Sequence, residues 1–353
     1  MSENYTPLSM DELLMYVHGA AVIQLLRSGV ELNVFPILYE HRYLTLQELN
    51  AHIRIDAQSI RTLFMGLTAL RLVNKNGDRY SNSTVIEELI AAEEWEVFKA
   101  LVMFQAYIVY PGQVDYLESL IAGQNVGIRR YPGEGDTLYE KFRFDPRTKN
   151  IFYLYMNKYS DYANPYVLAK VDFSSTRQVL DVGGGGGSNA IALAVNYPEL
   201  EVTILDLPAA QQICEEQIGR HGLSGQIRFM ACDIFKDGFP RGFDDVLFFH
   251  ELMIWNHNQI RYLLKQAYNS LDETGRVVIV GSVSNDSEDG PVMAALDTVY
   301  FRSVAAGQGM VYPWKDYENI LLDVGFESVT RIKCDTWTPH GIIIGHKEER
   351  EGS

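Results

Sequence analysis

The chain has 353 residues, of which 47% are hydrophobic and 12% are aromatic. This length allows one large or two medium domains, and the hydrophobic share is enough to build a packed core. The formal net charge of −16 argues against nucleic-acid substrates and against anionic membranes. A small molecule is therefore the expected partner.

No uninterrupted apolar stretch reaches the roughly 18 residues of a transmembrane helix. The first residues, Met1–Tyr5, lack the basic and apolar regions of a signal peptide, so we expect a cytoplasmic protein. The three cysteines, Cys214, Cys232 and Cys334, are scattered along the chain, and their spacing fits no metal site. We expect buried free thiols and no bound metal.

The N-terminal region is predicted to be mostly helical. Residues 10–40 carry apolar side chains on more than one face, which is typical of helices buried against a partner as well as their own domain. Thr45 and Asp56 precede two further amphipathic segments and are expected to cap them. Residues 70–80 then have the pattern of a hairpin turning at an Asn-Gly pair. Helices followed by a small hairpin predict a winged-helix unit.

Many winged helices bind DNA, but this one lacks the basic stripe that DNA binding requires. We therefore expect residues 1–110 to form an all-α/winged-helix dimerisation domain and the protein to be a homodimer. Residues 111–174 are predicted to be a helical linker rich in Tyr, Phe and Met that lines a substrate pocket. Its aromatic run at 150–159 suits either a core or a pocket, and its place just before the next domain favours the pocket.

From about residue 175 the pattern changes to alternating strands and helices. This alternation predicts an α/β domain at residues 175–348, with a doubly wound, largely parallel sheet and ligands at the carboxyl ends of its strands. Beyond the first strand, further strands are expected near 202–206, 227–231, 245–249, 276–281, 327–333 and 341–346.

The most informative motif stands at the start of this domain. A short apolar strand, Val179–Val182, ends in five consecutive glycines, Gly183–Gly187, and a helical segment follows. Glycines let the backbone turn sharply and approach a ligand, and the helix N-terminus offers free N–H groups. Asp206, about twenty residues further on at the end of the next strand, is suited to hydrogen-bond both ribose hydroxyls. Together they predict an adenosine-containing ligand.

Three segments resemble the motifs of class I S-adenosylmethionine-dependent methyltransferases: Asp181–Gly187, Leu205–Pro208 and Cys232–Phe235. With the N-terminal unit, the chain resembles the small-molecule O-methyltransferase family of plant phenolic and bacterial natural-product enzymes along nearly its whole length. The resemblance implies a Rossmann-like class I methyltransferase domain that binds S-adenosylmethionine. It also implies methyl transfer to an oxygen or carbon of a small aromatic or polyketide-like metabolite in secondary metabolism.

The same resemblance assigns roles at the cofactor site. Three glycines would leave room for the methionine part of the cofactor, and an acid would hold the ribose hydroxyls. Two apolar side chains would enclose the adenine ring, and a second acid would accept a hydrogen bond from its amino group. An aromatic residue stands where the family has a lysine that meets the cofactor. The three glycines are Gly183, Gly185 and Gly187, and the acid that would hold the ribose is Asp206. Leu207 and Ile234 would enclose the adenine ring, and Asp233 is the second acid. Phe249 is the aromatic residue at the position of the lysine.

The chain departs from the family at the catalytic centre. There a His-Asp-Trp follows the fourth strand, and its histidine removes the substrate proton. The aligned residues here are Met253, Ile254 and Trp255, and a methionine cannot take a proton. Loss of a general base typically costs about 10²–10⁴-fold in rate.

Three explanations remain open. In the first, the substrate nucleophile needs no general base, as with an enolate, an ionised phenol or an activated aromatic carbon. Alternatively, another side chain is the base. In the third, the chain keeps the cofactor but catalyses a different reaction, such as a pericyclic or hydroxylation step. We favour methyl transfer that relies on proximity and orientation.

The candidate catalytic residues are His250, Tyr300 and Arg302. For His250 the alternatives are a base and a satisfied polar group in the pocket wall, whereas His257 is expected at the surface, in the first turn of a helix. Asp297 is expected to pair with a cation or with solvent, or to supply charge to the pocket. Substrate contacts are expected from Tyr155, Met156, Met253, Trp255, Met293, Leu296 and Tyr300.

Overall fold

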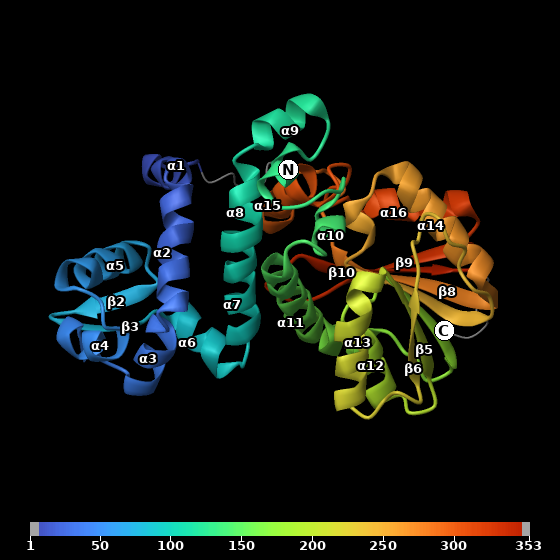
Figure 1. The fold of residues 1–353 in the computed structure, drawn as a ribbon, viewed down its shortest axis with the longest axis horizontal. Helices are drawn as coiled ribbons and strands as arrows, with labels where there is room; N and C mark the ends of the chain where they lie inside the picture. Colours follow the sequence, from blue (N-terminus) through green and yellow to red (C-terminus); the bar gives the residue numbers. More distant parts are fainter. Residues whose placement is uncertain (1–6, 348–353) are drawn as a thin grey trace. The chain divides into compact units, whose positions relative to one another are not determined.

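The computed structural model describes residues 7–347, and the chain divides into two compact units, Met1–Ile108 and Val109–Ser353 (Figure 1). Met1–Tyr5, on which the predicted location depends, lie outside the described residues. All three cysteines are described, and each is buried and free, as predicted.

The first unit consists of short helices and a three-stranded sheet of order β1-β3-β2. Its helices are α1 (Met10–Val17), α2 (Gly19–Glu31), α3 (Val34–His41), α4 (Leu46–Ile53), α5 (Ala57–Ala69), α6 (Thr84–Ala91) and α7 (Trp95–Phe104), after which the π-helix η1 (Gln105–Val109) runs into the second unit. Its strands are β1 (Leu44–Thr45), β2 (Val73–Asn76) and β3 (Arg79–Asn82).

Local sequence signals explain how these elements start and turn. Thr45 forms a capping box with Glu48 at the start of α4, and the Asp56 carboxylate accepts two backbone N–H groups at the start of α5. The hairpin pairs Asn76 with Arg79, so its turn lies one residue later than the predicted Asn-Gly pair. The predicted winged-helix architecture is confirmed.

Helix α1 carries apolar side chains but buries none of its residues. Leu14 is 50% exposed and Val17 is 70% exposed. Between residues 7 and 347, no single helix is long and apolar enough to cross a membrane, although the bent pair α1 and α2 passes the same test together by length and composition.

The second unit contains a seven-stranded sheet of order β6-β5-β4-β7-β8-β10-β9. Its strands are β4 (Gln178–Val182), β5 (Glu201–Asp206), β6 (Ile227–Ala231), β7 (Phe243–Phe249), β8 (Leu271–Ser282), β9 (Ser328–Lys333) and β10 (His340–His346). Its helices are α8 (Tyr110–Gln113), α9 (Tyr116–Ala122), η2 (Val126–Arg130), α10 (Leu138–Lys141), α11 (Pro146–Lys170), α12 (Ser188–Asn196), α13 (Pro208–Arg220), η3 (Leu252–Ile254), α14 (His257–Ser270), α15 (Val292–Tyr300), η4 (Phe301–Ala305) and α16 (Trp314–Val324).

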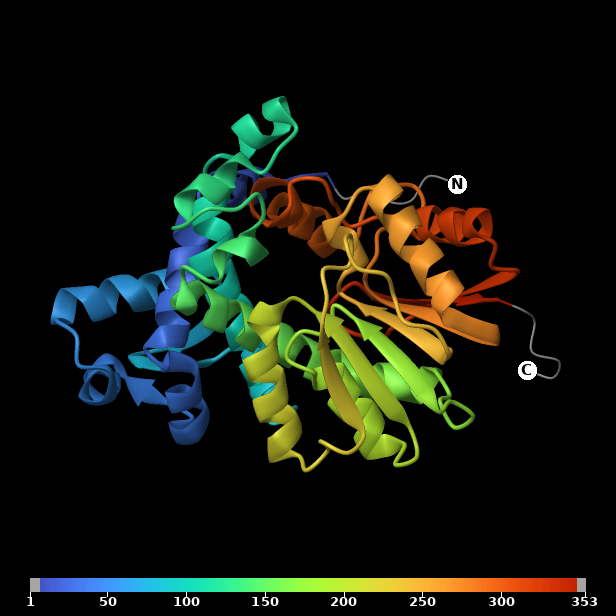
Figure 2. The ribbon, with the colours of Figure 1, turned by 45° about the vertical axis from the view of Figure 1, so that its right-hand side comes forward.

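Both faces of this sheet are covered by helices, as Figures 1 and 2 show. Successive strand residues point to opposite faces, so Leu180 and Val182 pack with α14 and α16, whereas Val179 packs with α11, α12 and α13. Strands β4 to β8 pair in parallel, and β10 runs antiparallel to both β8 and β9. The predicted doubly wound, largely parallel sheet is confirmed.

Residues 111–174 belong to the same compact unit as the sheet. The long helix α11 continues through Pro165 to Lys170 and packs against α12. This packing places the aromatic run at 150–159 beside the start of the cofactor region, because α12 begins directly after the glycine loop.

A buried ion pair joins the middle strands at their amino ends. The Arg276 guanidinium donates from Nε to Asp245 Oδ1 at 2.8 Å and from Nη2 to Oδ2 at 3.1 Å, and Thr176 also donates to Oδ2 at 2.7 Å. Both ionic side chains are nearly or wholly inaccessible to water. Removing one partner would leave a buried charge unpaired.

We therefore predict that Asp245→Ala lowers the free energy of unfolding by about 3–5 kcal/mol, measured by urea denaturation. The matched control is Asp323→Ala, which removes an exposed pair with Arg261 and is expected to cost less than about 1 kcal/mol. Equal effects of the two substitutions would contradict the assignment of a structural role to the buried pair.

Candidate active site

The glycine run forms a tight loop between β4 and α12. Gly183, Gly185 and Gly187 have φ values of 74°, 54° and 83°, a left-handed backbone that other residues rarely adopt. A side chain at Gly185 would meet the Tyr153 ring at 3.8 Å, an ordinary contact distance, so the loop is not tightly packed at this position. The loop therefore presents its backbone to a ligand.

Asp206 fixes the loop to the end of β5. Its carboxylate accepts the Gly185 N–H at 2.7 Å and the Leu207 N–H at 2.6 Å. Burial raises the pKa of Asp206 to about 6 despite these two hydrogen bonds, which act in the opposite direction.

Two more acids lie at the loop. Asp181 is fully buried, no described residue hydrogen-bonds either carboxyl oxygen, and burial raises its pKa to about 7. Glu251 follows β7 and accepts the Trp255 indole N–H at 2.9 Å through Oε1. Its Oε2 lies 2.7 Å from where a side-chain carbon on Gly183 would stand. Burial raises the pKa of Glu251 to about 8.

No Lys or Arg within residues 7–347 forms an ion pair with Asp181, Asp206 or Glu251. One buried and two partly buried acids without a cation favour a positively charged ligand, because a nearby positive charge stabilises their ionised forms. S-adenosylmethionine fits this requirement with its sulfonium and α-ammonium groups, and when bound it supplies an electrophilic methyl group. The glycine loop, the ribose acid and the uncompensated charge therefore suit this cofactor.

The adenine side of the predicted site is less enclosed. Leu207 and Ile234 are half-buried, and Ile234 packs against the core on the α14 side of the sheet. Asp233 is held by the Lys236 ammonium at 2.6 Å and by the Phe235 N–H at 3.1 Å. Phe249, aligned with the family's lysine, is instead packed in the core on the α11 side.

Aromatic side chains from α10, α11 and α15 lie close to one another. The hydroxyls of Tyr139 and Tyr300 lie 3.4 Å apart, and the rings of Tyr155 and Tyr159 lie 5.2 Å apart. Asp297 on α15 makes no hydrogen bond or ion pair with any described residue, and burial raises its pKa to about 7. Its negative charge contributes, after burial, to raising the pKa values of Tyr155 and Tyr159, so it lies near both.

His250 lies at the end of β7 with a φ of 57°. Neither ring nitrogen has a hydrogen-bond partner among the described residues, and burial lowers its pKa to about 4. Its ring lies 4.8 Å from that of Tyr159 and 5.0 Å from that of His340. His250 is therefore neutral at pH 7 and a weak base.

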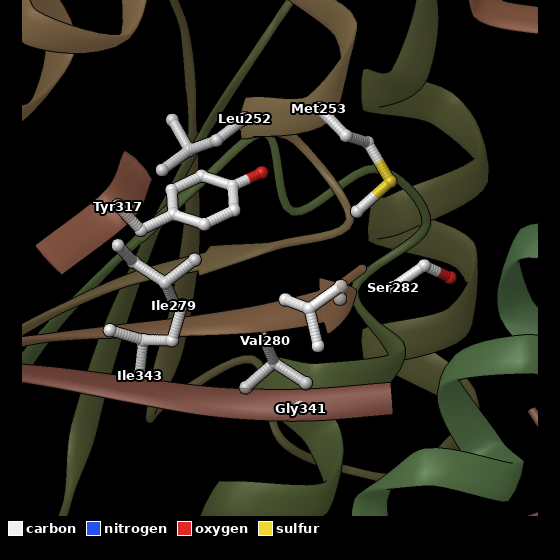
Figure 3. Close-up of a pocket in the computed structure, with 10 residues that line it drawn as sticks. Leu252, Met253, Ile279, Val280, Ser282, Tyr317, Gly341 and Ile343 are labelled. Atoms are coloured by element: carbon white, nitrogen blue, oxygen red, sulfur yellow. The ribbon is translucent and has the colours of Figure 1, made fainter. Parts of the chain in front are cut away.

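Met253 lies in η3 and is 6% exposed. Its side chain turns toward β8 (Figure 3), where its methyl group occupies the space that any side chain at Gly281 would need. The small pocket around it is mainly apolar and is lined by Leu252, Ile279, Val280, Ser282, Tyr317 and Ile343 among others. Met253 thus fills space and offers no proton acceptor.

Comparison with known proteins gives the family. A family described as the O-methyltransferase domain matches residues 121–327, and a second one, the O-methyltransferase dimerisation domain, matches residues 14–91. The chain is 40% identical to the L-tyrosine C(3)-methyltransferase of Streptomyces lavendulae, over 97% of this chain and 94% of that protein. The chain belongs to the O-methyltransferase family. It is an S-adenosylmethionine-dependent methyltransferase of secondary metabolism.

Other similar proteins are also methyltransferases. The chain is 27% identical to the 3-hydroxy-5-methyl-1-naphthoate 3-O-methyltransferase of Streptomyces sahachiroi, over 85% of each chain. The apo structure of the S-adenosylmethionine-dependent methyltransferase SibL has a TM-score of 0.83 and 37% identity, covering 96% of this chain and 99% of that one. Human N-acetylserotonin methyltransferase in complex with S-adenosylmethionine shares the fold, with a TM-score of 0.82, 20% identity and coverage of 99% and 100%.

The remaining predicted site residues of this methyltransferase differ in burial and in their contacts. Met156 and Met293 are half-buried, whereas Leu296 is 65% exposed. Arg302 donates to the Gly307 carbonyl at 2.7 Å, so it supports a turn of the backbone. His257 is half-exposed and lies 2.9 Å from Asp316, which fits the surface position expected for it.

The sequence alone assigns no role to four residues of the site. Asp181 has a signal, since it precedes the glycine run inside an apolar strand. Glu251 has a weaker signal, since it is the second residue after the fourth strand. Tyr139 and His340 have none, because their roles depend on contacts between segments far apart in the chain.

We predict that Asp206→Ala weakens S-adenosylmethionine binding by at least about 10-fold, since it removes charged hydrogen-bond acceptors.

In the wild type, affinity for S-adenosylmethionine should fall as the pH drops below the raised pKa values, about 6 for Asp206 and about 7 for Asp181, because protonation removes the negative charge that binds the cation. Calorimetry measures both effects. Glu201→Ala, at the exposed opposite end of β5, is the control, and unchanged affinity of Asp206→Ala would defeat the assignment.

Proposed function

We propose that the protein transfers a methyl group to a ring carbon beside the hydroxyl of a phenolic amino acid. The observation that carries this proposal is the 40% identity to an L-tyrosine C(3)-methyltransferase over 97% of the chain and 94% of that relative. The proposal narrows the established activity, S-adenosylmethionine-dependent methylation, to one kind of acceptor atom.

The residues of the pocket support a carbon acceptor. We infer that Met253 takes the place of the histidine base of family members that methylate oxygen. Its side chain packs on Gly281 in an apolar environment. A phenol that loses its proton shares the negative charge between its oxygen and the ring carbons beside it. Such a carbon is an adequate nucleophile when the pocket holds it in line with the methyl group.

Asp297 supports an amino-acid substrate. It is a carboxyl group without a hydrogen bond or ion pair to any described residue, and it lies near two aromatic rings of the pocket. A substrate α-ammonium placed there would supply the missing positive charge, while Tyr155 and Tyr159 would contact the aromatic ring. The arrangement suits a molecule with a phenol at one end and an amine at the other.

Incubation with L-tyrosine and labelled S-adenosylmethionine should yield a product heavier by one labelled methyl group, which fragmentation places on the ring. L-phenylalanine is the matched control and should not react, because it has no hydroxyl to release electron density into the ring. Should other phenolic amino acids be the preferred substrates, the methyl group should again lie on a ring carbon. A methyl ether as the main product would contradict the proposal.

We also propose that the protein acts as a homodimer through its first unit. The dimerisation family matches residues 14–91, and α1 within this unit buries none of its apolar side chains. A second copy of the same chain would cover this face and remove it from water. With a net charge of −16, neither a nucleic acid nor an anionic membrane suits the surface as a partner.

The double substitution Leu14→Glu and Val17→Glu should shift the protein from dimer to monomer, measured by light scattering after size exclusion, because it places charges in the apolar contact. Met65→Glu is the control, since Met65 is 72% exposed on α5, away from α1 in the sequence. A wild type that is monomeric at all concentrations tested would refute the homodimer.

A further inference from the structure

We propose that Glu251 is the base that accepts the proton of the substrate's phenolic hydroxyl. This inference rests on the proposed function, because it supplies the proton acceptor that Met253 lacks. Glu251 would act as a catalytic residue in contact with the substrate, and the acid would compensate for a histidine that this chain does not have at the aligned place.

The position of Glu251 joins the cofactor loop to the substrate pocket. Its Oε2 approaches Gly183 so closely that any side chain there would collide with it. Its negative charge is also among the causes, after burial, that raise the pKa values of Tyr139 on α10 and Tyr153 on α11. Glu251 therefore lies where a substrate ring against those tyrosines would meet the methyl donor.

One oxygen of the Glu251 carboxylate is held by a hydrogen bond, and the other is not. The Trp255 indole N–H holds Oε1 at 2.9 Å, and the Trp255 ring packs edge-on against Phe235 with centroids 4.7 Å apart. No described residue hydrogen-bonds Oε2. The second oxygen is thus available to a hydroxyl, and its direction is set by the first.

Other groups in the pocket suit the task less well. A base is most effective when its pKa lies near the working pH and not far below that of the group it deprotonates, about 10 for a phenol. Burial lowers the pKa of His250 to about 4, whereas burial raises that of Glu251 to about 8. Burial also raises the pKa of Tyr300, which keeps it protonated. A bound cation would hold Glu251 ionised at neutral pH.

The proton and electron balance is complete without a further reagent. The O–H bond breaks, its proton passes to Oε2 of Glu251, and the electron pair remains on the oxygen and spreads into the ring. The ring carbon beside the oxygen then forms the new bond to the methyl group while the sulfur–methyl bond of the donor breaks, and the electron pair of that bond stays on the sulfur. That carbon releases its hydrogen as a proton to water, and the C–H electron pair restores the aromatic ring. Glu251 finally returns its proton to the oxygen, so each turnover releases one proton.

The decisive variant is Glu251→Gln, because the amide oxygen can still accept the Trp255 indole N–H. We expect kcat with L-tyrosine to fall by about 10²–10⁴-fold, the usual contribution of a general base. Affinity for S-adenosylmethionine, measured by calorimetry, should also fall, because one of the three acids that favour the cation is neutralised, so kcat is compared at saturating cofactor. The loss should shrink with ring-fluorinated tyrosines, because their more acidic hydroxyls need less help to ionise.

Asp297→Asn is the matched control, since it also converts one pocket carboxyl to an amide. It should raise KM and leave the pH dependence of kcat in place, whereas Glu251→Gln should remove the limb of the profile that reports ionisation of Glu251. A Glu251→Gln variant with near wild-type kcat and an unchanged profile would overturn the proposal. So would a large loss of cofactor affinity with normal kcat at saturation, which would make Glu251 a ligand of the cofactor.

A binding measurement separates this proposal from the choice of substrate. With S-adenosylhomocysteine present, 4-nitrophenol bound to the wild type should show its coloured phenolate form at a higher pH than when bound to Glu251→Gln, because a carboxylate in contact with the hydroxyl disfavours a second negative charge beside it. If the wild type methylates no phenolic amino acid but this difference appears, the proposed function fails and the base assignment stands. Identical titrations, or no binding of the probe, would overturn the assignment.

Discussion

The two hydrogen bonds from backbone N–H groups to Asp206 are the constraint on which the cofactor region depends. The Gly185 bond connects the end of β5 to the glycine loop at the end of β4, whereas the bond from the adjacent Leu207 orients the carboxylate. A left-handed Gly185 is needed for its N–H to point at the carboxylate. The acid that is expected to hold a ribose therefore also shapes the loop that receives the rest of the molecule.

This arrangement carries an electrostatic cost when no cation is present. Asp181 is buried, Asp206 and Glu251 are partly buried, and none of the three has a basic partner among the described residues, so their pKa values rise. A positively charged ligand stabilises the ionised carboxylates. Part of the selectivity for such a ligand therefore comes from the unfavourable free energy of these acids when no cation is bound. The same reasoning applies to Asp297 and a substrate ammonium on the other side of the pocket.

Much of the fold follows from local sequence signals. The short apolar run that contains Val179 and Leu180 predicts a strand, and in the structure these two residues pack on opposite faces of the sheet. The glycine run marks the cofactor loop because its backbone needs residues without side chains. These signals are readable because each depends on neighbours within a few residues.

The catalytic side of the pocket is not readable in this way. The direction of Glu251 depends on an indole four residues away and on the left-handed backbone of His250. His340 reaches the cluster from the start of β10, and its place there depends on strand order. A residue such as Leu296 suits a pocket by its type, yet it lies on an exposed part of α15. Side-chain direction in these cases is a tertiary property.

The short helix η3 explains how a base at Glu251 and an apolar residue at Met253 can coexist. Near three residues per turn, side chains two positions apart point about 120° from each other. Met253 accordingly reaches β8 at Gly281, while Glu251 reaches the glycine loop at Gly183. A carboxylate at the loop leaves the β8 side of the pocket apolar. A phenol ring can then present its carbon to the methyl group while its oxygen faces the acid, which is the geometry that carbon methylation needs.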